Sequence, residues 1–300
     1  MTVPDDRRGE GPEGLNRPRI YTAPDAFRAV LHGAACVHPG SVFDALSARV
    51  ATELGFETAI LGGSSASLAV LGAPDHIVLT LTELADLVRR ITRAGAPSLL
   101  VDADHGYGNA LSVMRTMQEL HAAGAAAATI EDTALPRAFD AARPTLIGMA
   151  ELVGKIRAAV AASPGIVVVG RTGALSVTTL DDATLRARAM EDAGAEALFF
   201  TGVTDRAQIA VLRSATTRPI ILGGAKPGLA TREELAGIGV RIALQGHLPI
   251  LAALEAVRAT LTAQRAGFGV TGLPDAGFVG RMTREADYDA AISDFLGGQL

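Results

Sequence analysis

Short apolar runs alternate with longer amphipathic stretches along most of this chain. Each run holds four or five residues rich in Ala, Val, Ile and Leu, as is typical of a strand buried in a parallel sheet. In the stretches between them, apolar residues recur with the helical period, and Gly or Pro stands near the ends. The predicted strands lie at residues 33–37, 58–61, 98–101, 126–130, 166–169, 197–200, 219–222 and 240–244, and the predicted helices at 81–93, 110–123, 152–162, 180–193, 206–215 and 231–237.

Eight strands that alternate with helices favour an α/β fold of the (β/α)8 TIM-barrel type. The alternative is an open, doubly wound sheet of the Rossmann type, but no Gly-x-Gly-x-x-Gly motif follows the first run. Residues 1–22 show little apolar periodicity, and we expect a flexible N-terminal arm there. Residues 23–265 are predicted to form the barrel, and residues 266–300 a C-terminal helical extension. Gly267-Phe268-Gly269 and Thr271-Gly272-Leu273-Pro274 are expected to break that extension into separate segments.

Composition narrows the classes of protein to consider. The chain has 300 residues, of which 49% are hydrophobic and 20% charged, and this suffices for one large core. A formal net charge of −5 without a long basic block argues against nucleic acid as a partner. No apolar run reaches the roughly 18 to 20 residues of a membrane span. The single cysteine, Cys36, permits no intrachain disulfide, and we expect a cytoplasmic protein.

Carboxylates follow two successive predicted strands. Asp102 and Asp104 come just after the run 98–101, and Glu131 comes directly after the run 126–130. Alternate strand residues share a face, and ligands of barrels gather beyond the carboxyl ends of the strands. Oxygen ligands alone favour magnesium or manganese over zinc. The competing interpretation is a solvated turn, because Asp-x-Asp is common there.

Three further groups follow predicted strands. Gly62-Gly63-Ser64 offers backbone N–H groups and a hydroxyl for a carboxylate, or is a plain loop. Arg171 is suited to grip a carboxylate with two hydrogen bonds, or pairs with an acid such as Glu131. His247 follows the last run and would orient a substrate group or donate a proton, although a lone histidine is often structural.

Taken in order, these segments resemble the isocitrate lyase and phosphoenolpyruvate mutase superfamily, and within it the bacterial oxaloacetate decarboxylase branch. The resemblance covers roughly residues 26–265 and rests on a combination of motifs rather than on any one of them. The motifs are Ser41-Val42-Phe43-Asp44-Ala45-Leu46-Ser47-Ala48-Arg49, Gly62-Gly63-Ser64-Ser65-Ala66-Ser67, Asp102-Ala103-Asp104-His105-Gly106-Tyr107-Gly108-Asn109, Ile130-Glu131-Asp132-Thr133 and Val153-Gly154-Lys155-Ile156-Arg157.

The resemblance implies a magnesium ion bound by Asp104, with Asp102 and Glu131 acting directly or through waters. It implies a small α-keto acid substrate, whose carboxylate the serine segment at Ser64 and Arg171 would hold. A histidine after the eighth strand, here His247, belongs to the decarboxylase branch. The resemblance also implies a homotetramer, a dimer of dimers, in which the C-terminal helix is exchanged between subunits.

Three departures bear on the substrate. Lyases of isocitrate and methylisocitrate carry a Lys-Lys-Cys-Gly-His gate, whereas residues 135–140 here contain no cysteine. The family usually continues Arg-Thr with Asp or Asn, but Gly173 stands there. The branch is expected to have a tyrosine after the seventh strand, and this chain has Ala225 or Lys226.

The sequence therefore predicts a Mg²⁺-dependent decarboxylase or C–C lyase acting on an α-keto dicarboxylate. Oxaloacetate, converted to pyruvate and CO₂ through a metal-bound enolate, is the first candidate. Two alternatives stay open. One is related enolate chemistry, as in an alkylmalate or methylisocitrate type lyase or a phosphonate mutase or hydrolase. The other is a catalytically inactive carboxylate-binding protein.

Overall fold

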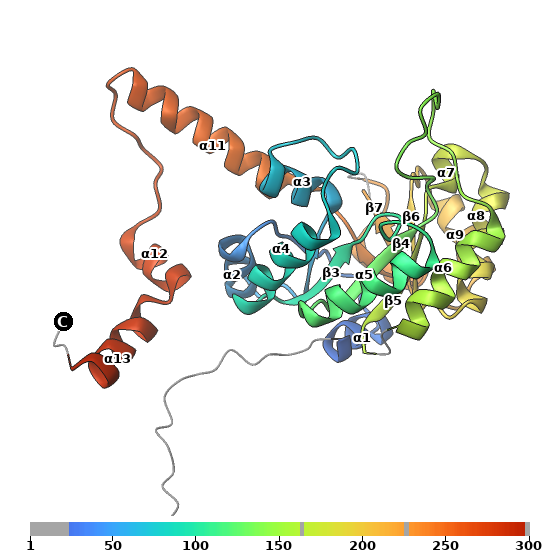
Figure 1. Ribbon diagram of the computed structural model, residues 1–300, viewed down its shortest axis with the longest axis horizontal. Coiled ribbons are helices and arrows are strands. Elements are labelled where there is room, and N and C mark those ends of the chain that lie inside the picture. The colour runs from blue at the N-terminus through green and yellow to red at the C-terminus, as the bar shows by residue number, and fades with distance from the viewer. Residues whose placement is uncertain (1–23, 163–164, 225–227, 298–300) are drawn as a thin grey trace, which may run out of the picture.

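Eight parallel strands, paired in chain order, curl around a common axis with helices on the outside (Figure 1). The computed structural model describes residues 24–162, 165–224 and 228–297, so the predicted arm at 1–22 lies outside the described residues. The predicted TIM-type (β/α)8 fold is confirmed. The strands are β1 (Gly40–Ser41), β2 (Thr58–Leu61), β3 (Ser98–Asp102), β4 (Ala127–Glu131), β5 (Val167–Thr172), β6 (Ala197–Thr201), β7 (Ile220–Gly223) and β8 (Val240–Ala243).

The first strand differs from its prediction. Residues 33–37 were expected to form it, but β1 is Gly40–Ser41 and only Val37 makes an isolated bridge, to Ile242. Val37 donates its N–H to the Arg241 carbonyl at 2.9 Å, and its own carbonyl accepts from the Ala243 N–H at 3.0 Å. Pro39 has no N–H to give to a ladder, which explains a strand in two short pieces. Together the pieces link β2 to β8 and close the barrel.

Alternation along the strands creates two cores. In β2, the Ile60 side chain lies in the cluster inside the barrel, whereas Ala59 and Leu61 belong to the larger cluster between strands and outer helices. The fully buried Phe27 and Leu31 of helix α1 (Pro24–His32) join the inner cluster. Helix α1 thus covers the amino-terminal end of the barrel and leaves the carboxyl ends of the strands for a site.

The outer helices begin at polar caps. Thr80 and Glu83 form a reciprocal capping box at the start of the helix Leu81–Arg93, and Thr231 does the same with Glu234 at the helix Arg232–Gly237. Helices α1, α2, α3 and α7 are additional to those predicted, and a long helix at Leu248–Arg265 occupies the end of the range predicted as barrel. The remaining helices are α2 (Ala45–Glu53), α3 (Gly63–Leu71), α4 (Leu81–Arg93), α5 (Ala110–Ala122), α6 (Met149–Ala162), α7 (Ala174–Val177), α8 (Leu180–Asp192), α9 (Arg206–Ala215), α10 (Arg232–Gly237), α11 (Leu248–Arg265), α12 (Ala276–Thr283) and α13 (Glu285–Leu296).

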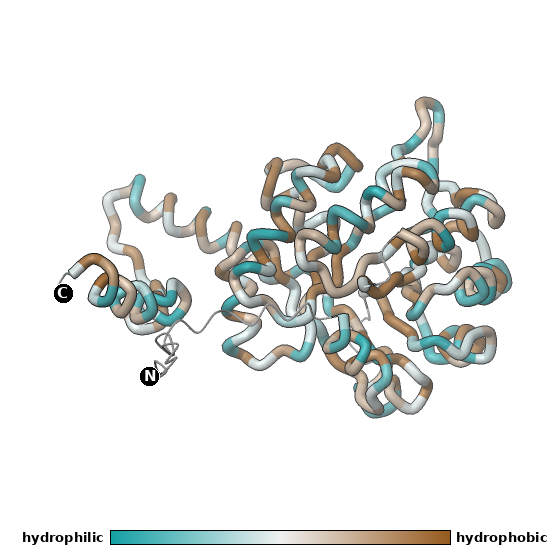
Figure 2. Tube along the Cα trace, turned by 60° about the horizontal axis from the view of Figure 1, so that its bottom comes forward, coloured by the Kyte–Doolittle hydropathy of each residue, from teal (hydrophilic) through white to brown (hydrophobic). Residues whose placement is uncertain are grey.

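The C-terminal helices extend to one side of the barrel (Figure 1). Helix α11 carries apolar side chains that are exposed in the single chain, among them Leu251, Leu254 and Leu261, and brown segments mark it in Figure 2. Helix α12 returns to α2, where Arg49 donates from Nη1 to the Met282 carbonyl at 2.5 Å. Exchange of a helix between subunits stays a prediction. Within the described residues, no helix has the length and apolar character needed to cross a membrane.

A glycine in the loop after β3 gives a test of how tightly this part of the fold is built. Gly106 has φ +80°, and a Cβ there would overlap the Val113 side chain, so Gly106→Ala should lower the free energy of unfolding by about 2 to 4 kcal/mol. Gly154, inside α6, has open space where a Cβ would stand, with no atom within 4 Å, so Gly154→Ala should raise it by about 0.5 to 1 kcal/mol. Urea unfolding of both variants measures the difference, and equal effects would contradict the packing described.

Candidate active site

The loop after β3 turns Asp104 into the carboxyl-terminal mouth of the barrel. The strand ends at Asp102, and Asp104 has a left-handed backbone with φ +49°, so the two acids do not share a face through strand alternation as predicted. The Glu131 N–H donates to the Asp104 carbonyl at 2.8 Å. Lys155, buried on α6, donates from Nζ to the His105 carbonyl at 3.1 Å. These two bonds hold the loop after β3 against strand β4 and helix α6.

One guanidinium lies among the carboxylates. Arg171, near the end of β5, approaches Asp102 Oδ2 with Nη1 at 2.5 Å and Glu131 Oε2 with Nε at 3.1 Å. Its Cζ also lies 5.5 Å from the ring centre of Phe199, a cation–π distance. Asp102 Oδ1 accepts from Thr129 Oγ1 at 2.9 Å. Asp102 and Glu131 are therefore held in place, and the sequence alternative in which Arg171 pairs with Glu131 is present.

Asp104 is the acid that this arrangement leaves without a partner. No hydrogen bond or ion pair joins its carboxylate to any residue in the described ranges. Burial, and then the negative charges of Asp102, Asp75 and Glu131, raise the pKa of Asp104 to about 9. Burial alone would also raise the pKa of Asp102, but Arg171, Thr129 and the Asp104 N–H hold it below its usual value. Without a cation, Asp104 therefore keeps its proton near pH 7, and an ion that binds its carboxylate must displace that proton.

Asp75 is a site residue that the sequence analysis missed. It lies in the connection between α3 and α4, follows Pro74 and comes after no strand, so strand-end reasoning gave no signal for it. The residue is exposed overall, but its carboxyl lines the same cavity as Asp104, and partial loss of solvent there, together with the charge of Asp102, raises its pKa. Asp75 therefore adds a further acid to the mouth of the barrel.

The glycine segment and His247 meet beside Asp104. Gly62 caps α3 and Gly63 begins it, so the expected loop is the first turn of a helix. A Cβ at Gly62 would overlap the imidazole Nε2 of His247, and one at Gly63 would lie 2.9 Å from Asp104 Oδ1. Only glycine permits this close approach. Ser64 is half-buried in the same turn of α3, but it is not among the residues that line the adjacent cavity.

His247 is held by one side-chain contact. Its Nδ1 lies 2.8 Å from Ser41 Oγ, a partner that the sequence did not indicate. Burial lowers the pKa of His247, and Arg171 lowers it further, whereas Asp102 and Asp75 raise it by less, so the imidazole is neutral near pH 7. When Ser41 donates to Nδ1, the proton of the neutral ring is on Nε2, the nitrogen that faces Gly62.

A cavity of about 560 Å³ opens beside these residues. Its lining comes from the loops after β3, β4, β5 and β6 and from the α3–α4 connection. The lining residues are Asp75, His76, Ile77, Asp104, Glu131, Thr133, Leu135, Arg137, Pro144, Arg171, Gly173, Ser176, Val177 and Thr201. Asp102, Gly62, Gly63 and His247 lie next to lining residues but not among them. Ala225 and Lys226 lie outside the described residues.

The donor set suits a hard divalent cation. Among residues 24–162, 165–224 and 228–297, no three His, Cys, Asp or Glu side chains are grouped closely enough to hold an ion by themselves. Arg171 already pairs with Asp102 and Glu131. Mg²⁺ usually takes one or two carboxylates and completes its octahedron with waters and substrate oxygens. An unpartnered Asp104 with nearby carboxylates is compatible with that mode of binding.

Comparison with known proteins shows which family the chain is similar to. Its residues 27–265 match the family described as phosphoenolpyruvate phosphomutase. An oxaloacetate decarboxylase of Bradyrhizobium sp. strain BTAi1 is 53% identical over 277 residues, covering 91% of this chain and 96% of the relative. One of Rhodopseudomonas palustris strain CGA009 is 54% identical over 278 residues, with the same coverage.

Solved structures agree in fold. That of oxaloacetate acetylhydrolase with the inhibitor 3,3-difluorooxalacetate has a TM-score of 0.81 at 27% identity and covers 93% of this chain and 98% of its own. That of phosphonopyruvate hydrolase with oxalate and Mg²⁺ has a TM-score of 0.80 at 27% identity, covering 91% and 99%. The match over most of the barrel, with relatives above half identity, shows that the chain belongs to the phosphoenolpyruvate phosphomutase family.

Proposed function

We propose that this protein is a Mg²⁺-dependent decarboxylase that converts oxaloacetate to pyruvate and CO₂. The observation that carries the proposal is the half-buried Asp104 carboxyl, which has no partner among the described residues, is surrounded by acids and opens into a cavity that Arg171 also lines. Relatives named oxaloacetate decarboxylase, at 53% identity across nearly their whole length, support the choice of substrate. Mn²⁺ is an alternative ion, since it accepts the same oxygen ligands.

Asp104 would hold the ion directly, and Asp102 and Glu131 would do so through waters, because Arg171 already engages both of them. When bound, the cation supplies Lewis-acid stabilisation of the negative charge that develops on the keto oxygen. The two ion pairs of Arg171 use Nη1 and Nε. Within the described residues Nη2 therefore keeps its donors for a substrate carboxylate.

The reaction breaks the bond between the carbon next to the keto group and the distal carboxylate, which leaves as CO₂. The electron pair of that bond moves toward the keto oxygen, and a proton must then reach the carbon to give pyruvate. His247 is our candidate for orienting the substrate through its Nε2–H, with Ser41 fixing the ring. It can supply the proton only as imidazolium, because loss of the proton from the neutral ring would leave an imidazolate. The N–H groups of Gly62-Gly63-Ser64, at the start of α3, are the candidate contacts for the retained carboxylate.

The loop between β4 and α6 favours decarboxylation over cleavage of larger hydroxy acids. Lyases of the isocitrate type resemble one another in the Lys-Lys-Cys-Gly-His gate of this loop, but residues 132–148 contain no lysine, cysteine or histidine, and Arg137 lines the cavity instead. A guanidinium is always protonated and is a poor proton donor. Arg137 is suited to contact a carboxylate rather than to protonate a leaving group.

Removal of the cation should stop turnover. Purified protein with Mg²⁺ is expected to release pyruvate and CO₂ from oxaloacetate with saturation kinetics, above the decay caused by Mg²⁺ alone. EDTA should abolish this turnover, and added Mg²⁺ or Mn²⁺ should restore it. A coupled assay for pyruvate measures the rate. Turnover that persists in EDTA, or none above the metal-only background, would contradict the proposal.

Asp104→Asn should remove the cation site while keeping the volume of the side chain. Because a neutral amide is a far weaker ligand for Mg²⁺, we expect kcat/KM for oxaloacetate to fall on the order of 10³-fold or more. The exposed Asp192 of α8 gives a matched control, and Asp192→Asn should behave like the unaltered protein. Circular dichroism checks that both variants are folded. Retention of most Mg²⁺-dependent activity by folded Asp104→Asn would sink the assignment.

A further inference from the structure

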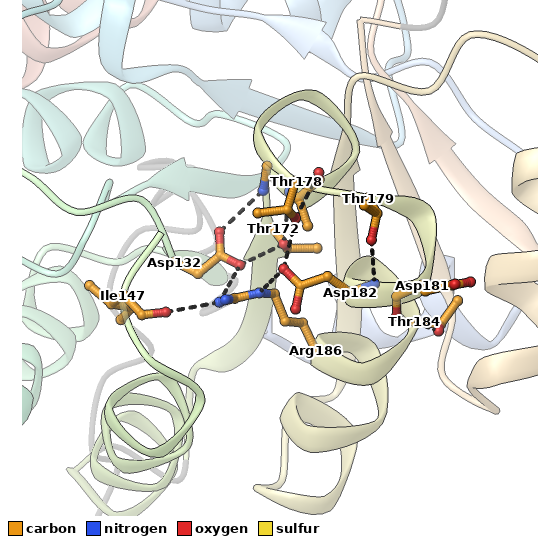
Figure 3. A network of polar contacts seen from close by, with 11 residues as sticks. Asp132, Ile147, Thr172, Thr178, Thr179, Asp181, Asp182, Thr184 and Arg186 are labelled. Carbon is orange, nitrogen blue, oxygen red and sulfur yellow. Dashed lines mark hydrogen bonds and ion pairs between the residues drawn. The ribbon is translucent and has the colours of Figure 1, made fainter. Parts of the chain in front are cut away.

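A buried ion pair lies directly behind the candidate site, on the outer side of strands β4 and β5 (Figure 3). Asp132 is 0% exposed and Arg186, from α8, is 7% exposed. Arg186 Nη1 lies 3.2 Å from Asp132 Oδ2. The pair contacts none of the cavity space itself, because neither residue is among the lining residues.

The first wall that this pair holds is the end of β5. Thr172 donates from Oγ1 to Asp132 Oδ2 at 2.6 Å, and the Gly173 N–H donates to Asp132 Oδ1 at 3.2 Å. Thr172 directly follows Arg171, and Asp132 directly follows Glu131. Because neighbouring strand residues point to opposite faces, the bonds on the outer face fix the backbone that aims Arg171 and Glu131 inward.

The second wall is the loop from β4 to α6. Ile147, near the end of that loop, donates its N–H to the Asp132 carbonyl at 2.8 Å. Its own carbonyl accepts from Arg186 Nη1 at 3.1 Å. The same ion pair therefore holds Ile147 by both backbone groups. The segment between Asp132 and Ile147 contains the cavity-lining residues Thr133, Leu135, Arg137 and Pro144.

The third wall is the short helix α7 and its junction with α8. Arg186 donates from Nε to Asp182 Oδ2 at 2.9 Å, and Thr178 donates from Oγ1 to the same oxygen at 2.7 Å. Thr178 follows α7, which contributes Ser176 and Val177 to the cavity lining. One arginine thus reaches, directly or through one carboxylate, all three segments.

We propose that Asp132, Arg186 and Asp182 form a positioning network that sets the geometry of the candidate site and holds the 133–146 loop over it. The inference rests on the proposed function for its kinetic consequence. A buried ion pair contributes little to stability compared with apolar residues of the same volume, so its hydrogen bonds to three cavity walls are the feature that needs explanation. Misplacement of reacting groups by about 1 Å can lower rates on the order of 100-fold.

The test replaces Arg186 by lysine, which keeps the charge beside Asp132 but loses the planar fork that joins Asp132, Asp182 and Ile147. Asp182→Asn is a milder second variant, in case the first folds poorly. The control is Arg28→Gln, which removes the half-buried Arg28–Glu196 pair between α1 and the barrel, with Nε to Oε2 at 2.7 Å. That pair lies at the opposite end of the strands from the site.

Three readouts separate positioning from mere stability. The first is the rate of trypsin cleavage after the exposed Arg137, followed by mass spectrometry. The second is the affinity for oxalate with Mg²⁺, measured by calorimetry. The third is kcat and KM for oxaloacetate, measured well below the unfolding temperature of each variant.

For Arg186→Lys we expect faster cleavage after Arg137 and weaker oxalate binding, each by about tenfold, and a fall in kcat/KM of about 10- to 100-fold. Asp182→Asn should change all three in the same direction by less. Arg28→Gln should lower the unfolding temperature only. Wild-type values of all three readouts in folded Arg186→Lys would overturn the proposal. If the unaltered protein does not decarboxylate oxaloacetate, the proposed function fails, and cleavage and oxalate affinity still decide this inference.

Discussion

Arg171 is one positive charge among at least three carboxyl groups at the mouth of the barrel, and the site depends on that imbalance. It neutralises Asp102 and Glu131 by direct contact, at 2.5 and 3.1 Å, and leaves Asp104 with a pKa of about 9. Charges buried without compensation are costly in a protein interior. A divalent cation at Asp104 removes the imbalance and places a Lewis acid beside a guanidinium that still has free donors. The same arrangement of Arg171 among the three carboxyl groups therefore accounts both for binding of the ion and for binding of a carboxylate substrate.

The barrel makes this concentration of charge possible because its strands supply one site residue each at a shared end. Strands β3, β4 and β5 deliver Asp102, Glu131 and Arg171 to one rim, while α1 covers the other end with Phe27 and Leu31. Behind the rim, the Asp132–Arg186 pair ties the outer faces of β4 and β5 to the loops that form the cavity. The charged residues at the mouth of the barrel are thus held in place by hydrogen bonds on the outer faces of the strands that carry them.

Much of the fold followed from pattern alone, because strands β2 to β8 are buried on both faces and appear as continuous apolar runs. Helix α4 matched its predicted range because its apolar period and capping signals agree, whereas Gly63 and its serines look like a loop and begin α3. The first strand was misplaced because Pro39 interrupts it. Asp75, Ser41 and the Asp132–Arg186 pair come together only through tertiary contacts between distant segments, which no local pattern encodes.

The position of a bound cation is the measurement that would decide whether Asp104 is the centre of the site. Crystals of the protein grown with Mn²⁺ and oxalate, measured at a wavelength where manganese scatters anomalously, would locate the ion without reference to activity. We expect one anomalous peak in the cavity at the mouth of the barrel, in contact with the Asp104 carboxylate, with Arg171 still between Asp102 and Glu131. A fully ordered site with no peak there, or a peak held by other residues, would contradict this assignment.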